Sequence, residues 1–468
     1  MKGSYILMES LKAEGVDTIF GYPGGSIIPV FDALYDYTDT FNFQLFRHEQ
    51  GASHAAEGYA RTSGKVGVCI VTSGPGATNA ITGISDAMMD STPMVVIAGQ
   101  VGAAALGTDA FQEIDMVGIT QPITKWSYQI RRAEDVAPAV ARAFYIASTG
   151  RPGPVVLDFT KNAQNEETEF LYKKCLYSRG YIPTPDIEPD QIELAAKLIN
   201  EAKKPFALVG QGVILGGAEA ELMRFLEKAE IPAASTLLGL SAMPTDFRLN
   251  KGFLGMHGNI APNMKTNECD VLIAIGMRFD DRVTGNLKTY AKQAKVIHLD
   301  IDPAEIDKNV KATVRVLGNV KTTLPMLTEK LNENHHGEWI DSFKEDDEKE
   351  LSSVIQKAIN PQEGPLKMGE IVRKVSDATG REAVLVTDVG QNQMEAARYF
   401  QYKLTRSIVT SGGLGTEGFG LPAAIGAKVG VPHRTVCLFV GDGGFQMNVQ
   451  ELGTIMQSNV GVKIVLLN

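Results

Sequence analysis

Short apolar runs that alternate with helical patterns are the feature that most constrains the fold of this chain. Residues 66–71, 94–98 and 154–158 form such runs, and residues 135–148 have the spacing of an amphipathic helix. Continuous apolar runs of this length are typical of strands buried on both faces of a parallel sheet. The pattern continues with runs at residues 206–209, 271–275, 295–299, 383–387, 435–440 and 462–467. The alternation predicts the α/β class, with doubly wound parallel sheets.

The length of 468 residues is enough for three domains of ordinary size. Pro183, Pro185 and Pro189 mark the first linker, and the charged segment 341–349 marks the second, as a solvated helix or linker. We predict three doubly wound domains, over residues 1–165, 185–335 and 365–468. No helix follows the last apolar run, so we expect a chain truncated within an incomplete third domain.

Composition and charge argue against several classes of function. The formal charge of −10 disfavours a nucleic-acid partner, and no apolar run is long enough to span a membrane. The four cysteines form no Cys-x-x-Cys pair, which disfavours a zinc site and fits a reducing, cytoplasmic location. No histidine has a metal-ligand spacing, and His335 and His336 are expected to be solvated. We therefore expect a cofactor to supply the chemistry.

Glu49 lies between a predicted strand, residues 43–46, and a predicted helix, residues 52–61. Ligands of α/β sheets bind at the carboxyl ends of strands, so this carboxylate is a candidate binding residue. An acid at a helix start, stabilised by the helix dipole, explains the position equally well.

Two glycine-rich turns follow strand signals in the same predicted domain, at residues 21–26 and 72–79. Both place bare backbone at a helix start, where amide groups can hold an anion or a ring edge. Such turns also commonly connect strands to helices without binding a ligand. Two of them beside Glu49 on one sheet favour a binding site.

The second and third predicted domains carry weaker signals. Gly210-Gln211-Gly212 follows a strand without completing a Gly-x-Gly-x-x-Gly fingerprint, and Asp300 ends a strand, where an acid can hold ribose hydroxyls. Asp442, within Gly441–Gly444, follows another strand and offers the oxygen ligand that Mg²⁺ prefers beside phosphate. A helix predicted at residues 448–458 would direct its N-terminus at a diphosphate. Structural turns are the alternative at each position.

Taken together, these motifs resemble the large, catalytic subunit of the acetolactate synthases (acetohydroxyacid synthases), a thiamine-diphosphate-dependent family. The resemblance covers the whole chain. It is carried, in order, by residues 21–25, 47–49, 72–79, 109–113, 151–155, 254–258, 278–285, 411–415 and 441–443.

The resemblance implies a site for thiamine diphosphate and Mg²⁺. Glu49 would hydrogen-bond the aminopyrimidine ring, Arg282 would receive the carboxylate of a second keto acid, and Gln112 and Lys161 match other active-site positions. Asp442 would bind the metal. The other cofactor-binding positions would be Tyr22, Pro23, Gly24, Gly25, Thr72, Pro75, Asn79, Gln391, Asn392, Gly415, Glu417, Gly441, Gly443 and Gly444.

The resemblance also implies a central domain that binds FAD in a structural role. The matching positions are Arg151, Gly210, Gly212, Thr236, Leu237, Met256, His257, Gly258, Gly276, Arg278, Asp300 and Ile301. The implied substrates are pyruvate and 2-ketobutyrate, at the first common step of branched-chain amino acid synthesis. Because the family forms its active site between subunits, a homodimer or homotetramer is expected, with a small regulatory subunit as a further partner.

Some positions depart from the family pattern. Glu417 stands where the family has a methionine that holds the cofactor bent, and a carboxylate there needs a partner or an altered pKa. Asn392 replaces a common histidine, and Asn319 replaces an acid at the FAD site. Asn468 matches the residue before the second metal ligand, so we expect the chain as written to be inactive.

Two other functions stay open at this point. A pyruvate oxidase or a 2-keto acid decarboxylase would share Glu49, but Arg282 within residues 278–282 favours the synthase. A non-catalytic flavin-binding homologue would fit Glu417, whereas Gln112 and Lys161 argue against it.

Overall fold

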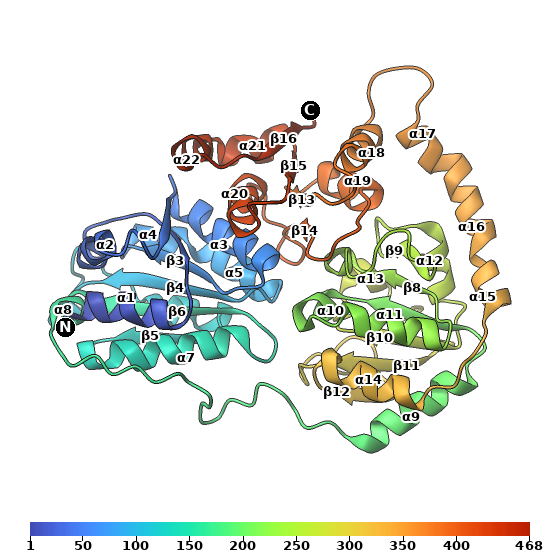
Figure 1. The fold of residues 1–468 in the computed structure, drawn as a ribbon, viewed down its shortest axis with the longest axis horizontal. Coiled ribbons are helices and arrows are strands. Elements are labelled where there is room, and N and C mark those ends of the chain that lie inside the picture. The colour runs from blue at the N-terminus through green and yellow to red at the C-terminus, as the bar shows by residue number, and fades with distance from the viewer. The chain divides into compact units, whose positions relative to one another are not determined.

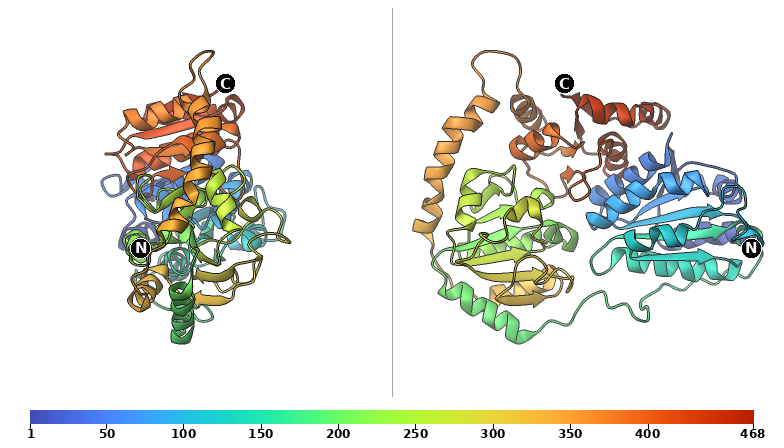
Figure 2. Two further views of the ribbon diagram at one scale, coloured as in Figure 1. Left: turned by 90° about the vertical axis from the view of Figure 1, so that its right-hand side faces the viewer. Right: turned by 180° about the vertical axis from the view of Figure 1, so that it is seen from behind.

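The computed structural model describes residues 1–468 and contains three sheets of parallel strands (Figures 1 and 2). The chain divides into two compact units. One unit comprises residues 1–183, 386–389 and 409–468, and the other comprises residues 184–385 and 390–408. The predicted fold class, parallel-sheet α/β, is confirmed.

The first sheet has the strand order β2-β1-β3-β4-β6-β5. Its strands are β1 (Thr18–Gly21), β2 (Asn42–Leu45), β3 (Gly67–Val71), β4 (Met94–Gln100), β5 (Trp126–Ile130) and β6 (Pro154–Thr160). The helices of this part are α1 (Gly3–Ala13), α2 (Ile28–Tyr35), α3 (Glu49–Ser63), α4 (Pro75–Asn79), α5 (Ile81–Met89), α6 (Met116–Thr120), α7 (Val136–Ser148) and α8 (Lys161–Asn165). Short 3₁₀ turns are η1 (Ala103–Ala105), η2 (Gln121–Ile123) and η3 (Ala133–Asp135).

Each central strand of this sheet contributes to two separate cores. In β3, Val68 and Ile70 pack with α1, α2 and α7, whereas Cys69 and Val71 pack with α3 and α5 on the opposite face. Successive strand side chains point to opposite faces, so a strand covered on both sides must be apolar throughout. This is why the apolar runs located these strands to within one or two residues.

The second sheet has the order β12-β11-β10-β7-β8-β9. Its strands are β7 (Pro205–Val209), β8 (Ala233–Ser235), β9 (Asn250–Phe253), β10 (Val271–Ile275), β11 (Lys295–Asp300) and β12 (Val314–Leu317). Its helices are α9 (Pro189–Glu201), α10 (Gln211–Gly216), α11 (Glu219–Lys228), α12 (Ile260–Thr266), α13 (Asp281–Thr284) and α14 (Val320–Lys330), with a 3₁₀ turn η4 (Leu237–Gly239). Again one core lies on each face of the sheet.

The third sheet has the order β14-β13-β15-β16. Its strands are β13 (Val384–Thr387), β14 (Ile408–Val409), β15 (Val436–Val440) and β16 (Lys463–Leu466). The helices around it are α18 (Met368–Ala378), α19 (Gln391–Tyr399), α20 (Gly420–Gly430), α21 (Asp442–Met447) and α22 (Leu452–Ser458). The helix predicted at residues 448–458 is wrong at its start, because the 3₁₀ turn η6 (Val449–Glu451) precedes α22 and the helix after β15 begins at Asp442.

The charged segment between the second and third sheets is helical and partly buried. It forms α15 (Gly337–Asp341), α16 (Phe343–Glu350), a π-helical turn η5 (Leu351–Ile355) and α17 (Gln356–Ile359). Phe343 is fully buried, and the Glu350 carboxylate accepts from the backbone N–H of Ile260 at 2.8 Å and pairs with Arg398. Residues 341–349 are thus helical, with charged side chains that are exposed or half-buried, while Phe343 packs on the second sheet.

His336 is also buried, contrary to the expectation that both neighbouring histidines are solvated. Its ring nitrogens lie 2.8 and 3.1 Å from the carbonyl oxygens of Ala229 and Ala202. The side chain of His335 is 90% exposed. No helix combines the length and the apolar character that crossing a bilayer requires.

Helices α3 and α20 cross at glycines. A Cβ atom at Gly426 would lie 1.8 Å from the carbonyl oxygen of Ala55, and a Cβ atom at Gly58 would lie 2.1 Å from that of Ala423. Real Cβ atoms do not approach so closely, so the two backbones can pack at this distance only because both positions lack a side chain.

We predict that Gly426→Ala lowers the free energy of unfolding by about 1–3 kcal/mol or more, because the helices must separate. The change is measured as a lower unfolding temperature in calorimetry. Gly337→Ala is the control, since a Cβ atom there meets nothing within 4 Å at the exposed start of α15. Equal unfolding temperatures for the two variants would contradict this account of the crossing.

Candidate functional site

Glu49 is the first residue of α3 and follows β2 by three residues. The side chain of His48 caps the helix, accepting from the backbone N–H of Gln50 at 3.1 Å. Glu49 is 8% exposed, and its Oε2 accepts from the side-chain amide of Asn79 at 2.9 Å. A Cβ atom at Gly76 would lie 3.1 Å from Oε1. The glycine thus leaves room beside a carboxylate that is buried and oriented, which favours the binding interpretation over a plain helix-start acid.

The two glycine-rich turns of the first sheet are joined to each other. The hydroxyls of Ser26 and Thr72 lie 3.0 Å apart, and Ser26 Oγ accepts from the backbone N–H of Ser73 at 3.0 Å. A Cβ atom at Gly24 would lie 2.5 Å from the side chain of Thr72. The turns therefore form one surface at the carboxyl ends of β1 and β3. Tyr22, Pro23, Gly25 and Pro75 are exposed there.

Gln112 and Lys161 reach these same turns from later segments. A Cβ atom at Gly74 would meet Gln112 at 2.9 Å, so the backbone of Gln112 packs directly on the turn before Pro75. Gln112 has φ +60°, an uncommon conformation for a residue with a side chain. Lys161 begins α8, and its Nζ lies 3.4 Å from the carbonyl oxygen of Gly25. The structure thus gathers Glu49, Gln112 and Lys161 around the glycine turns.

The C-terminal part of the same unit contributes a loop and a helix start. Asp388 accepts from the backbone N–H groups of Gly418, at 3.1 Å, and Gly420, at 2.8 Å. A Cβ atom at Gly444 would lie 2.3 Å from Asp388, so the turn that follows β15 rests on this carboxylate. The remaining predicted positions here are exposed or half-buried: Gly415, Glu417, Gly441, Asp442 and Gly443.

Glu451 is a site residue that sequence reasoning missed. It is fully buried in η6, and both carboxylate oxygens lie 3.2 Å from the backbone nitrogen of Arg47, which leads into Glu49. Burial raises the pKa of Glu451, while bonds from Thr454 and Arg47 oppose that shift. The only sequence signal is an acid between Gln450 and the apolar residues of α22. The pairing with Arg47 spans 404 positions and has no local pattern.

Gln391 and Asn392 lie at the start of α19, which belongs to the other unit. Gln391 is exposed and Asn392 is 3% exposed. Gly390, which precedes the helix, has φ +126°, a conformation that glycine adopts readily and other residues rarely adopt.

The predicted FAD positions of the second unit gather at the carboxyl edge of its sheet. Gly210 follows β7 and Gly276 follows β10, and a Cβ atom at Gly210 would lie 2.1 Å from the carbonyl oxygen of Gly276. Gly276 has φ +58° and packs on Gly212 at the same contact. The other positions follow the ends of neighbouring strands: Thr236 and Leu237 after β8, Met256, His257 and Gly258 after β9, and Asp300 and Ile301 at β11.

Arg282 lies beside this edge with its guanidinium exposed. The backbone N–H of Met256 donates to the Arg282 carbonyl at 2.7 Å, and Arg282 Nη1 lies 3.6 Å from the Met256 sulfur. The Arg282 side chain is 67% exposed, and Arg278 Nε lies 3.7 Å from Asp280. Partial burial and the nearby arginines lower the pKa of His257. Arg151 belongs to the first unit, where its Nε donates to Ser91 Oγ at 2.8 Å.

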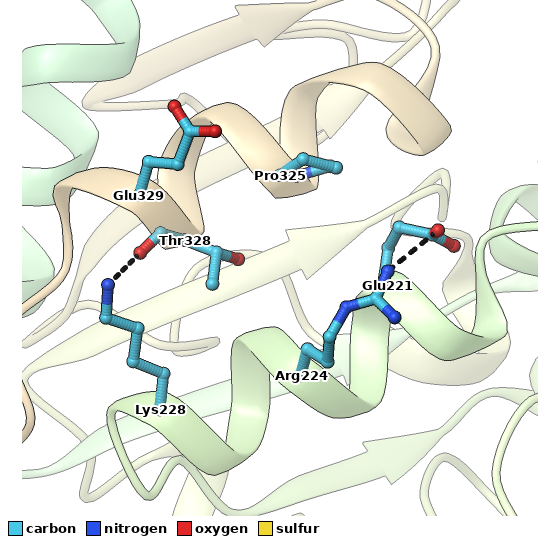
Figure 3. A pocket seen from close by; sticks show the side chains of 6 residues that line it. All are labelled: Glu221, Arg224, Lys228, Pro325, Thr328 and Glu329. Atoms are coloured by element: carbon cyan, nitrogen blue, oxygen red, sulfur yellow. Dashed lines mark hydrogen bonds and ion pairs between the residues drawn. The ribbon is translucent and has the colours of Figure 1, made fainter.

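A separate hollow lies between α11 and α14 of the second unit (Figure 3). Within it, Arg224 pairs with Glu221 at 2.9 Å, and Lys228 donates to the Thr328 carbonyl at 2.7 Å. It contains none of the predicted site residues.

The structure also brings together a buried cluster of ionisable side chains that was not expected from the sequence. Polar atoms of His54, Glu57 and Asp86 all lie within 4.8 Å of one another, although no histidine has a metal-ligand spacing in the sequence. Burial lowers the pKa of His54 to about 4 and raises that of Asp86 to about 8. Burial also raises the pKa of Glu57 well above its ordinary value. Protonated carboxyl groups therefore reduce the charge held in this dry region.

Comparison with known proteins places these features in a family. Three profiles match in order: the thiamine pyrophosphate enzyme N-terminal TPP binding domain at residues 1–119, the central domain at 192–327 and the C-terminal TPP binding domain at 388–468. A probable acetolactate synthase large subunit of Methanocaldococcus jannaschii is 47% identical over 99% of this chain and 79% of its own length. Acetolactate synthase large subunits of Lactococcus lactis and Corynebacterium glutamicum are each 44% identical over the whole chain and over 80% and 75% of their own lengths.

The chain belongs to the acetolactate synthase large-subunit family of thiamine pyrophosphate enzymes. The family resemblance inferred from the motifs is confirmed. The assignment of individual residues to roles, and the domain boundaries at 1–165, 185–335 and 365–468, stay predictions.

We predict that Asp86→Asn changes how stability depends on pH. An acid whose pKa rises on folding binds more protons in the folded state, so its contribution to stability falls as pH rises from about 4 through about 8. Asparagine cannot ionise and does not lose stability in this way. The difference in unfolding temperature, variant minus wild type, should therefore increase by several degrees between about pH 5 and about pH 8.

The control is Asp341→Asn, which changes a carboxylate that is 63% exposed. This variant should not reproduce the change between about pH 5 and about pH 8 that is expected for Asp86→Asn. A pH-independent difference for Asp86→Asn as well would show that the buried carboxyl group is ionised throughout, contrary to the prediction.

Proposed function

We propose that this chain catalyses the acetolactate synthase reaction, which decarboxylates pyruvate and joins the two-carbon unit to a second 2-keto acid. The observation that carries the proposal is the Glu49 site, where a carboxylate at the start of α3 is held by Asn79 beside the space left by Gly76. Family membership supports a role for that carboxylate in binding thiamine diphosphate. The two glycine turns, exposed at Gly25 and Pro75, form the adjacent surface.

The residues of the first unit fit thiamine diphosphate. Glu49 has one oxygen bonded to Asn79, and Oε1 faces the position where Gly76 has no Cβ atom, so this oxygen can accept or hold a proton on a ring nitrogen. When bound, thiamine diphosphate supplies the electron sink that decarboxylation and carbon–carbon bond formation require. With the cofactor bound, Glu49 would favour one ring tautomer, and the turns at Gly24 and Gly74 would border the ring.

Asp442 fits the role of a Mg²⁺ ligand. Its carboxylate is exposed at the first residue of α21, and a Cβ atom at Gly443 would meet nothing within 4 Å. An open carboxylate beside uncovered backbone suits an ion that takes few protein ligands and completes its shell with phosphate oxygens and water. Gly441 and Gly444 would border the diphosphate at the same turn.

Arg282 is proposed to bind the carboxylate of the second keto acid, pyruvate or 2-ketobutyrate. Its side chain is 67% exposed, and its guanidinium contacts only the Met256 sulfur and, at 3.8 Å, Asp281. An exposed guanidinium fork can bind a carboxylate with two parallel hydrogen bonds. Gln112 and Lys161 are proposed to orient the reacting groups at the glycine turns.

FAD is proposed to bind at the carboxyl edge of the second sheet. This edge has the features of a nucleotide site: closely packed glycine turns at Gly210, Gly212 and Gly276, an acid at the end of β11 in Asp300, and a cation in Arg278. In this reaction no electrons are transferred overall, so the flavin would stabilise the unit rather than take part in the chemistry.

The names of the matched relatives and the free cysteines support a proposal on assembly and location. We propose a homodimer or homotetramer with a small regulatory subunit as an additional partner, because the matched relatives are named large subunits. We propose a cytoplasmic location, which fits four free cysteines.

Glu49→Gln is expected to lower the rate of acetolactate formation by on the order of 10²-fold or more, because glutamine cannot exchange a proton with the cofactor ring. The assay uses pyruvate with thiamine diphosphate, Mg²⁺ and FAD. Glu134→Gln is the control, since this carboxylate is 56% exposed in η3 and pairs only with Arg132. Equal rates for Glu49→Gln and the wild type, with cofactor binding intact, would remove Glu49 from the mechanism.

Arg278→Ala is expected to weaken FAD binding by about 10-fold or more, the size of one charge-assisted hydrogen bond. The measurement is titration of flavin-stripped protein with FAD, followed by the visible flavin absorption. Arg224→Ala removes an equally charged side chain from the α11–α14 hollow and should leave FAD affinity unchanged. Loss of affinity in both variants, or in neither, would contradict the placement of the flavin at the carboxyl edge.

A further inference from the structure

A buried ion pair lies between α3 and the residue that follows α5. Arg61, in the last turn of α3, and Asp90 approach to 2.8 Å between Nη2 and Oδ2, with side chains 5% and 0% exposed. Arg61 Nε also donates to the Thr92 hydroxyl at 3.2 Å. A buried pair of this kind gives little net stability by itself, because desolvation of the two charges offsets their attraction. The pair also makes hydrogen bonds to the backbone of a neighbouring loop.

Both members of the pair bind the main chain of one loop, residues 410–418. Asp90 Oδ2 accepts from the backbone N–H of Gly412 at 2.7 Å, and Oδ1 accepts from that of Gly413 at 2.7 Å. Arg61 Nη1 donates to the Thr410 carbonyl at 2.7 Å. Three polar groups of the loop backbone are therefore fixed by charge-assisted hydrogen bonds, which are shorter and stronger than neutral ones.

The far end of the loop is fixed by a different carboxylate. Asp388 accepts from the backbone N–H groups of Gly418 and Gly420, and Asn448 Nδ2 donates to the Gly418 carbonyl at 2.6 Å. Between the two fixed ends, Leu414, Gly415 and Glu417 are exposed. Within the loop, Ser411 Oγ accepts from the backbone N–H of Thr416 at 2.9 Å. The exposed tip is thus fixed at both ends and by one hydrogen bond within the loop.

We propose that Arg61 and Asp90 are positioning residues that set the loop 410–418 for thiamine diphosphate. The inference rests on the proposed function and on the family resemblance, which implies that Gly415 and Glu417 bind the cofactor. An ion pair that served stability alone would not need three bonds to backbone groups of one loop, at Thr410, Gly412 and Gly413. Because α3 and α20 cross without side chains at Gly58 and Gly426, the element that carries Arg61 is itself rigidly placed.

The test compares Asp90→Asn, Arg61→Lys and a matched control, Asp158→Asn. Asparagine at position 90 turns an amide donor toward backbone N–H groups, and lysine at position 61 cannot reach Asp90, Thr410 and Thr92 together. Asp158 is fully buried and bonded to Gln100 and Gln129, so its variant matches the chemistry without touching the loop. The whole chain is used, with thiamine diphosphate and Mg²⁺ as the titrated ligands.

Three quantities are measured: hydrogen exchange of the peptide that covers residues 410–418, the thiamine diphosphate Kd by calorimetry, and kcat against KM for pyruvate. For Asp90→Asn and Arg61→Lys we expect exchange at Gly412 and Gly413 to accelerate and the cofactor Kd to rise by about 10-fold, as for the loss of one charge-assisted bond. KM for pyruvate should be nearly unchanged at saturating cofactor. Asp158→Asn should change none of these.

Unchanged loop exchange and cofactor Kd in the two variants, with only a lower unfolding temperature, would overturn the proposal and leave the pair a structural one. If Asp90→Asn fails to fold, Arg61→Lys decides by the same measurements. A wild-type chain that binds no thiamine diphosphate would instead overturn the proposed function, and the inference with it.

Discussion

The close crossing of α3 and α20 is the contact on which the candidate site depends. Gly58 and Gly426 let the two backbones meet, and α3 carries Glu49 at its first residue and Arg61 in its last turn. A side chain at either glycine would force the helices apart. The crossing therefore fixes the position of α3 relative to α20. Glu451 and Asp90 then join the two parts by bonds to Arg47 and to the loop 410–418.

Local sequence patterns were sufficient to predict the parallel sheets. Strands covered on both faces, such as β3 and β4, must be apolar at every position, so their runs are visible without any knowledge of the fold. Once the strands were located, the glycine turns and single acids that follow them in the sequence indicated the carboxyl edge of each sheet. Glu49, Asp300 and Asp442 were singled out because Asp300 ends a strand and the other two begin helices shortly after strands.

The remaining features depend on contacts between distant positions and have no local signature. His336 was expected in solvent, yet it satisfies two backbone carbonyls that lie more than 100 positions earlier in the chain. Glu451 and the His54–Glu57–Asp86 cluster are buried only because separate helices meet around them. A polar residue buried by tertiary packing resembles an exposed one in sequence, and this limits what residue type and spacing can reveal.

The most direct test of the central claim is the identity of the product formed from carbon-13-labelled pyruvate, followed by NMR. With thiamine diphosphate, Mg²⁺ and FAD, the account predicts acetolactate and carbon dioxide, and no acetolactate when thiamine diphosphate is left out. Acetaldehyde or acetate as the main product would show a decarboxylase or an oxidase instead. It would contradict the role given to Arg282 as the residue that receives a second keto acid.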